Sequence, residues 1–222
     1  MNLEMFPTPM SRRALLIFAD DARLDLARRR LPVAALPLLP TPAFEGAADV
    51  HLFGSRAQHG RTFAERFENA IETLSALGYQ EIVAVGRDCP DLSANDIAQA
   101  FAQLRGKRLV LGPDHRGGCY LIAFRSADRA LLRGIRWKRN TDCAELMARA
   151  SGQVSLLAMK HDIDSWADVR LVARTDNAMA RLATFLLATV NAVSQVIAPF
   201  VHAAVRFIRV RGQMPPPARV LA

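Results

Sequence analysis

Short apolar runs alternate with amphipathic segments along most of the chain. Runs typical of buried strands lie at 14–19, 50–53, 82–85, 108–111, 119–124 and 154–157. Helical spacing of apolar residues predicts helices over 23–30, 63–78, 93–104, 128–132, 141–150 and 165–173. Strands that alternate with helices in this way indicate an α/β fold, a three-layer αβα sandwich around a largely parallel sheet.

A strand, an acidic loop and a helix follow one another directly near the middle of the chain. Ser93 and Asp96 have the spacing of a capping box at the start of that helix. Leu92 and Ile97 stand where a hydrophobic staple would pack. The loop over 87–91 therefore follows the carboxyl end of a buried strand, where open α/β sheets bind their ligands.

The length of 222 residues suits one α/β domain with appendages. We expect a leader over 1–13, the domain over 14–175 and a C-terminal segment over 176–222. Four prolines between 31 and 46 argue against a regular helix there and favour an extended connection. Ser165 and Asp168 again have the spacing of a capping box and predict the last helix of the domain.

The C-terminal segment contains 24 residues, 182–205, without Asp, Glu, Lys or Arg. This length approaches that of a membrane span. A polar stripe at helical spacing and Pro199 instead favour an amphipathic helix within 178–210. We expect this helix to lie on a membrane surface or to pack against a partner subunit of a homo-oligomer, and the sequence does not decide between the two.

The formal net charge of +8 is divided between the domain and the C-terminal segment. Residues 176–222 hold five arginines and one aspartate, so half of the excess lies there. Neither part combines a basic stripe with aromatic residues, so we expect no nucleic-acid partner and favour anionic ligands or lipids. The N-terminus lacks the pattern of a signal peptide, which predicts a cytoplasmic protein, peripheral on the inner face of the membrane if the helix binds it.

Four aspartates have the placement expected of metal ligands. Asp88 and Asp91 lie in the loop after the central strand, and carboxylate oxygens suit Mg²⁺ or Mn²⁺ while a substrate phosphate completes the shell. Asp162 and Asp164 would offer a second carboxylate to the same ion. Asp91 could equally form a turn, and Asp164 could equally cap a helix.

Gly117 and Gly118 would let the backbone approach a ligand closely, although a tight turn between two strands needs the same residues. The three cysteines and five histidines show no spacing of a disulfide framework or a metal site. The sequence also has no nucleophile elbow and no Walker loop, which argues against covalent hydrolases and P-loop kinases.

Several segments, taken in order, resemble a known family. They are Q-H-G and F-A-E-R-F, then V-G-R-D-C-P-D-L, then G-P-D-H-R-G-G-C-Y-L-I, then Trp137, then D-I-D-S-W-A-D-V. From about Val50 to Ala173 the chain is similar to small glycosyltransferase-A-like proteins known as radical-SAM/selenodomain-associated or arsenosugar-type transferases. Those proteins resemble the molybdenum-cofactor and phospholactate guanylyltransferases in fold.

The resemblance implies a nucleotide-diphospho-sugar transferase fold and a site that uses Mg²⁺ or Mn²⁺. Asp88 would be the metal-binding aspartate, with Asp162 or Asp164 near the second metal position and Asp88 and Asp164 catalytic. Substrate-binding residues would be Gln58, Arg116, Gly117, Gly118, Tyr120 and Trp137, whereas Glu65 and Arg66 match the start of the family's helix and could be structural. The implied partners are a nucleotide-sugar or nucleotide and a small or lipid-borne acceptor.

The chain departs from the family pattern at two places, so other functions stay open. No glycine-bearing loop follows the first strand, and Arg28, Arg29 and Arg30 either contact phosphate in its place or form a solvated helix face. Arg116 stands where the family has an aspartate before the paired glycines. The sequence therefore predicts a metal-dependent sugar transferase, with a nucleotidyltransferase and a non-catalytic binding protein as alternatives.

Overall fold

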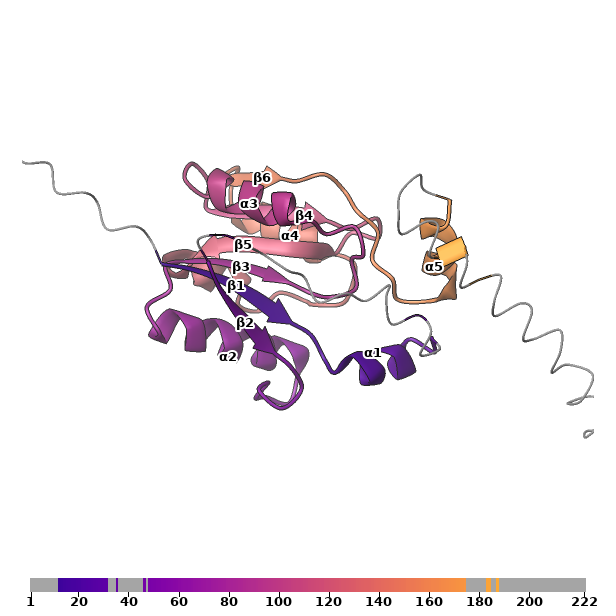
Figure 1. Cartoon of the computed structure of the whole chain (residues 1–222). Coiled ribbons are helices and arrows are strands. Elements are labelled where there is room, and N and C mark those ends of the chain that lie inside the picture. Colours follow the sequence, from indigo (N-terminus) through magenta and orange to yellow (C-terminus); the bar gives the residue numbers. More distant parts are fainter. Residues whose placement is uncertain are drawn as a thin grey trace, which may run out of the picture.

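The computed structural model describes residues 12–31, 35, 46, 48–174, 183–184 and 187 (Figure 1). Its centre is a six-stranded sheet with strand order β2-β1-β3-β5-β4-β6. The strands are β1 (Arg13–Phe18), β2 (Asp49–Phe53), β3 (Glu81–Val85), β4 (Leu109–Pro113), β5 (Cys119–Arg125) and β6 (Val154–Leu156). All run parallel except β5, which is antiparallel to both of its neighbours, so the prediction of a largely parallel sheet is confirmed.

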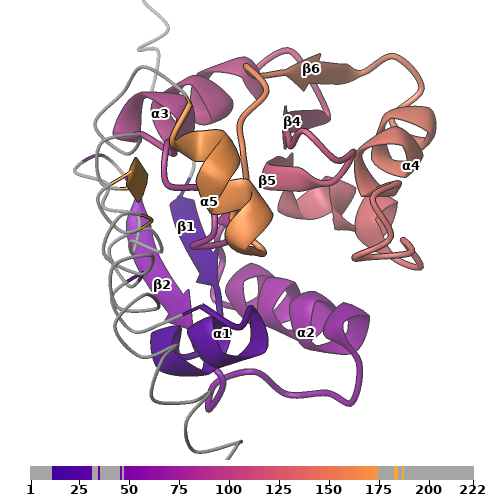
Figure 2. The same cartoon turned by 90° about the vertical axis from the view of Figure 1, so that its right-hand side faces the viewer.

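Helices cover both faces of the sheet, which confirms the α/β fold class. The helical elements are α1 (Ala22–Arg28), α2 (Phe63–Ala76), α3 (Ala94–Gln103), the 3₁₀ helix η2 (Ser126–Leu132), α4 (Asp142–Arg149) and α5 (Trp166–Val172). Apolar side chains of α2, η2 and α4 pack on one face, and those of α3 pack on the other (Figure 1). α1 and α5 lie beyond the carboxyl ends of the parallel strands (Figures 1 and 2).

The capping box predicted for α3 is present. The Ser93 side chain accepts a hydrogen bond from the backbone N–H of Asp96, and the Asp96 carboxylate accepts one from the backbone N–H of Ser93. The capping box predicted at Ser165 is wrong. Ser165 is the N-cap residue of α5, but its hydroxyl donates to the Asp168 carboxylate at 2.8 Å and accepts no hydrogen bond from a helix N–H. The same carboxylate also accepts the backbone N–H of Asp164.

A separate small core forms where α1 and α5 meet. Leu26, Ile163 and Val169 are buried in it, together with Ala183 from the C-terminal segment, and Leu187 packs against it. Ala183 and Leu187 of that segment thus contact the domain itself. The rest of the predicted helix over 178–210, residues 1–11 of the leader and most of the connection over 31–46 lie outside the described residues. No helix in the described ranges is long and apolar enough to cross a bilayer.

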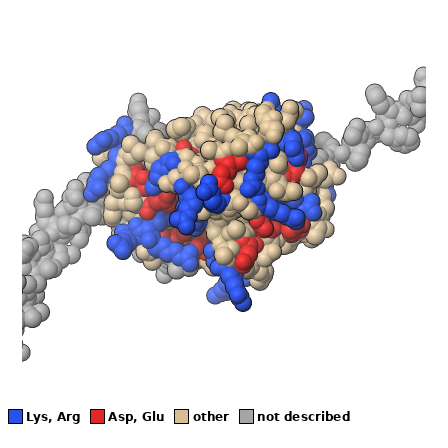
Figure 3. Space-filling view, turned by 180° about the vertical axis from the view of Figure 1, so that it is seen from behind, with Lys and Arg blue, Asp and Glu red and all other residues tan. Residues whose placement is uncertain are grey.

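Charged side chains of both signs are interspersed on the surface. In the view from behind, blue Lys and Arg side chains lie among red Asp and Glu side chains (Figure 3). Many of them form ion pairs, such as those of Glu72 with Arg129 and Arg133. The basic excess of the domain is therefore spread over this face rather than gathered on one patch.

Candidate functional site

One cavity of about 300 Å³ lies at the carboxyl ends of β1 and β3. The end of β1, the loop after β3, the loop between β4 and β5 and the segment before α5 all contribute to its walls. Its charged and aromatic lining includes Asp25, Arg29, Phe63, Arg66, Phe67, Asp88, Asp114, Trp137, Lys138, Asp142, Asp162 and Asp164. The cavity thus lies where ligands bind in open α/β sheets.

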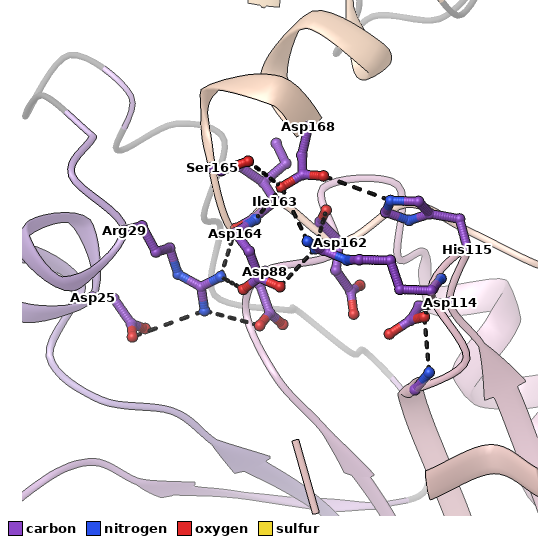
Figure 4. Close-up of polar contacts among 12 residues, drawn as sticks. Asp25, Arg29, Asp88, Asp114, His115, Asp162, Ile163, Asp164, Ser165 and Asp168 are labelled. Carbon is purple, nitrogen blue, oxygen red and sulfur yellow. Dashed lines mark hydrogen bonds and ion pairs between the residues drawn. The ribbon is translucent and has the colours of Figure 1, made fainter. Parts of the chain in front are cut away.

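Asp88 is brought to the cavity by a sharp turn after β3. A Cβ atom added to Gly86 would lie 2.4 Å from the Asp88 carboxylate, so a side chain at position 86 would displace that carboxylate. The backbone carbonyl of Asp88 accepts a hydrogen bond from the N–H of Ile163 at 2.7 Å. This bond places the segment with Asp162 and Asp164 beside Asp88, although the two segments are far apart in the sequence (Figure 4).

Asp162 is the buried acid of the site. The residue is 8% exposed, and its Oδ1 atom is shielded from solvent without a hydrogen-bond partner. Burial raises the pKa of Asp162 to about 9, and the negative charges of Asp88, Asp114 and Asp164 add to this effect. A hydrogen bond between the carboxyl groups of Asp162 and Asp114 stabilises the protonated form further.

Asp114 organises the loop between β4 and β5. Its Oδ1 atom accepts hydrogen bonds from the backbone N–H groups of Arg116 at 2.6 Å and Gly118 at 2.9 Å. A Cβ atom on Gly118 would lie 2.5 Å from Oδ2 of the same carboxylate. The loop therefore folds tightly around Asp114 and directs its carboxyl group towards Asp162 (Figure 4).

Two arginines pair with the outer carboxylates. The guanidinium of Arg29 donates to Asp88 at 2.9 Å and to Asp164, and it lies 4.0 Å from Asp25. Burial opposes the charge of Arg29, but Asp88, Asp164 and Asp25 together raise its pKa above the ordinary value. Arg116 donates to Asp164 at 2.6 Å. Asp164 is thus held between two cations, whereas no cation of the described ranges pairs with the Asp162 carboxyl group.

The donor set fits a divalent cation that is shared with a ligand. Among the described residues, no group of three His, Cys, Asp or Glu side chains is placed to hold a metal ion. Mg²⁺ is commonly held by one or two carboxylates while substrate phosphates and water complete the shell. Asp88, Asp114 and Asp162 offer oxygen donors of this kind, and the unpartnered buried oxygen of Asp162 would gain a ligand.

The structure brings only some of the predicted site residues together. Asp88, Asp162, Asp164, Gly118, Tyr120, Trp137 and Gln58 line the cavity. Asp91 lies outside the lining, and its backbone carbonyl accepts a hydrogen bond from Lys160. Arg116 and Gly117 also lie outside it, Arg116 tying its loop to the segment before α5.

Two of the lining residues have structural partners. The side-chain N–H₂ of Gln58 donates to the carbonyls of Ala19 and Phe53, and so joins the ends of β1 and β2. The Tyr120 hydroxyl donates to the carbonyl of Ala158 at 2.9 Å, and its ring is buried against Gly112. These contacts occupy the polar groups that would donate to a substrate.

Sequence reasoning missed Asp114 and left Arg29 undecided. Asp114 carried a usable signal, because it follows the end of β4 as Asp88 follows β3. Arg29 belongs to a run of three arginines, and only the fold shows that its side chain is 14% exposed whereas that of Arg28 is 53% exposed. Arg28 instead pairs with Asp20.

Gly117 offers a test of the loop geometry. Its φ is +99°, and an added Cβ would lie 2.4 Å from the backbone carbonyl oxygen of Asn140. We expect Gly117→Ala to lower the free energy of unfolding by about 3 kcal/mol, because strain and a clash with rigid backbone add together. Chemical denaturation measures the change.

Substitutions at two other glycines separate the effect of backbone strain from the effect of the clash. Gly152 has φ +79° with open space around it, and Gly106 has open space without a positive φ. Gly152→Ala should cost about 1 kcal/mol from strain alone, and Gly106→Ala about zero. Equal costs for Gly117→Ala and Gly152→Ala would show that the contact with Asn140 is not tight.

Residues 21–139 match the family described as "Uncharacterized protein conserved in bacteria (DUF2064)". The match spans more than half of the chain. The protein belongs to this family. No curated protein matches the sequence. The DUF2064 match begins after β1, covers Asp88 and Asp114 and stops before Asp162. The narrower resemblance to radical-SAM/selenodomain-associated transferases stays a prediction.

This DUF2064 protein is similar to several solved structures and shares the fold of the first one named here. A candidate nucleotide-diphospho-sugar transferase from Desulfovibrio desulfuricans G20 has 23% identity and a TM-score of 0.64, over 84% of this chain and 98% of that one. A homologue of Mycobacterium tuberculosis Rv0371c from Mycobacterium sp. strain JC1 has 13% identity and a TM-score of 0.48, over 78% and 98%. A Leptospira borgpetersenii cytidylyltransferase has 11% identity and a TM-score of 0.45, over 82% and 96%.

Proposed function

We propose that this DUF2064 protein is a divalent-cation-dependent transferase that moves a sugar from a nucleotide-sugar donor to a small or lipid-borne acceptor. The observation that carries the proposal is the buried Asp162 carboxyl group beside Asp88 and Asp114 in the cavity at the strand ends. A buried acid with an unpartnered oxygen is costly for a fold and is typical of functional sites. The shared fold with a candidate nucleotide-diphospho-sugar transferase supports the same reading.

Different residues of the site would have different roles in transfer. Asp88 and Asp162 would hold Mg²⁺ or Mn²⁺ together with substrate phosphate oxygens, and the bound cation would supply charge neutralisation of the diphosphate leaving group. Arg29 lies beside Asp88 and would donate hydrogen bonds to the same phosphates. Asp164 is then a positioning residue, because it pairs with Arg29 at the cavity and joins it to Arg116.

Transfer breaks the bond between the anomeric carbon and the donor phosphate oxygen, and the nucleoside diphosphate leaves with the electron pair. The acceptor oxygen forms the new bond to that carbon and gives up its proton. Because the protein mainly positions donor and acceptor, close placement in one cavity supplies much of the catalysis.

A product assay separates this function from its rivals. The purified protein is incubated with Mn²⁺ and either nucleotide sugars or nucleoside triphosphates. Release of nucleoside diphosphate from a nucleotide sugar supports sugar transfer, whereas pyrophosphate from a triphosphate supports a nucleotidyltransferase. Nucleotide binding without either product would support a non-catalytic binding protein and contradict both transferase functions.

A further inference from the structure

The start of α2 and the segment at 137–138 form a further part of the cavity wall. Phe63, Arg66 and Phe67 are three and four residues apart, so they share one face of the helix, and all three line the cavity. The Trp137 ring lies 6.0 Å from that of Phe63 and 5.2 Å from that of Phe67, centroid to centroid. This wall therefore combines an aromatic surface with an arginine.

The donors on this wall lack acceptors. The Nε atom of Arg66 and the Nε1 atom of Trp137 are both shielded from solvent without a hydrogen-bond partner. Both groups are donors only, so an oxygen acceptor must come from elsewhere to satisfy them. Lys138 adds a second cation, its Nζ 4.7 Å from the centre of the Phe63 ring.

The side chain of Glu65 has a structural role at the start of α2, and no such role is seen for its neighbour Arg66 in the described part of the chain. The Glu65 carboxylate accepts hydrogen bonds from the backbone N–H groups of Arg61 and Thr62, and completes the capping box of α2. Within the described ranges, Arg66 forms no ion pair with an acidic residue. Asp142 is the acid on this side of the cavity, and its carboxylate accepts the backbone N–H groups of Lys138 and Arg139.

We propose that Arg66, Lys138 and Trp137 form an anion subsite, which binds a carboxylate or phosphate group of the acceptor. Two cations and an unpartnered N–H favour an anionic group over a neutral one. The aromatic rings beside them would contact the apolar or planar part of the same ligand. That the ligand is the acceptor rests on the proposed function, because the donor diphosphate would lie beside Asp88 and Arg29.

The test uses the full-length protein with EDTA, so that no divalent cation can hold phosphate at the acidic pole. Inorganic phosphate and D-glycerate are titrated calorimetrically, with glycerol as the neutral control, and tryptophan fluorescence is recorded in parallel. We expect at least one anion to bind saturably and change the fluorescence, glycerol to do neither, and Trp137→Phe to remove the fluorescence change. Arg66→Met should weaken binding about tenfold or more, because it removes a charged donor.

Matched variants locate the anion. Arg61→Met, an exposed arginine outside the cavity lining and five residues earlier, should bind like the unmodified protein. Equal binding by Arg66→Met, loss in Arg29→Met alone, or no anion binding by the unmodified protein would overturn the subsite. If anions bind through Arg66 but nucleotides with Mn²⁺ do not bind, the subsite stands and the proposed transferase function fails.

Discussion

Asp88→Ala should weaken the joint binding of Mn²⁺ and a nucleoside diphosphate by about 100-fold or more. Loss of a residue that only supports a metal ligand costs about 10–100-fold in affinity, and loss of a direct ligand should cost at least as much. Asp88 lies at the end of β3, lines the cavity and contacts Arg29, so its removal would affect both the cation and a phosphate ligand. Isothermal calorimetry with the full-length protein measures the effect.

Asp91→Ala is the matched control. Asp91 belongs to the same loop and was also a candidate metal ligand from the sequence, but it lies outside the cavity lining. Its contact with Lys160 is made by the backbone carbonyl, which alanine keeps. Binding by Asp91→Ala should therefore stay within about twofold of the unmodified protein, since surface changes away from a site have small effects. An equal loss in both variants would contradict the assignment of Asp88.

Asp162→Asn should stabilise the cation-free protein and abolish cation-dependent nucleotide binding. The folded protein keeps the Asp162 proton up to about pH 9, the value to which its pKa is raised. The unfolded chain loses the same proton near pH 3.9. The contribution of Asp162 to stability is thus fully present below about pH 4 and is lost as the pH rises towards 9, because unfolding then releases a proton.

An asparagine side chain has no carboxyl proton to release, so the variant does not lose stability in this way as the pH rises. At pH 8 in EDTA its melting temperature should exceed that of the unmodified protein by about 4 °C, and the difference should shrink towards pH 4. With Mn²⁺ and the cognate nucleotide the unmodified protein should have the higher melting temperature, because only the unmodified protein gains a bound ligand. A pH-independent difference would show that Asp162 is not the titrating group.

The sequence predicted the elements that depend on local signals. The capping box at Ser93 joins groups within one helical turn, so its prediction depends only on neighbouring residues. The apolar run at 82–85 is buried on both faces of the sheet, as expected for a continuous run of apolar residues. Asp88 was found for a similar reason, since its place after a buried strand follows from topology. The order of strands and helices, from which the fold class was predicted, is confirmed by the structure.

The rest of the site depends on contacts between distant segments. Arg29 meets Asp88 across 59 positions and Asp164 across 135, and no local pattern distinguishes it from Arg28 or Arg30. The sequence favoured Asp88 over Asp91, because Asp91 could equally form a turn, but it did not show which of the two carboxylates reaches the cavity. In the structure Asp88 lines the cavity and Asp91 does not.

The most direct test of the transferase account is calorimetric titration of the full-length protein with UDP, GDP, CDP and their triphosphates, with and without Mn²⁺. The account predicts that one nucleotide binds, that binding requires the cation, and that Asp88→Ala and Asp162→Asn each remove it. Cation-independent binding, or no binding across the whole panel, would contradict a cation-dependent transferase site formed by Asp88, Asp114 and Asp162.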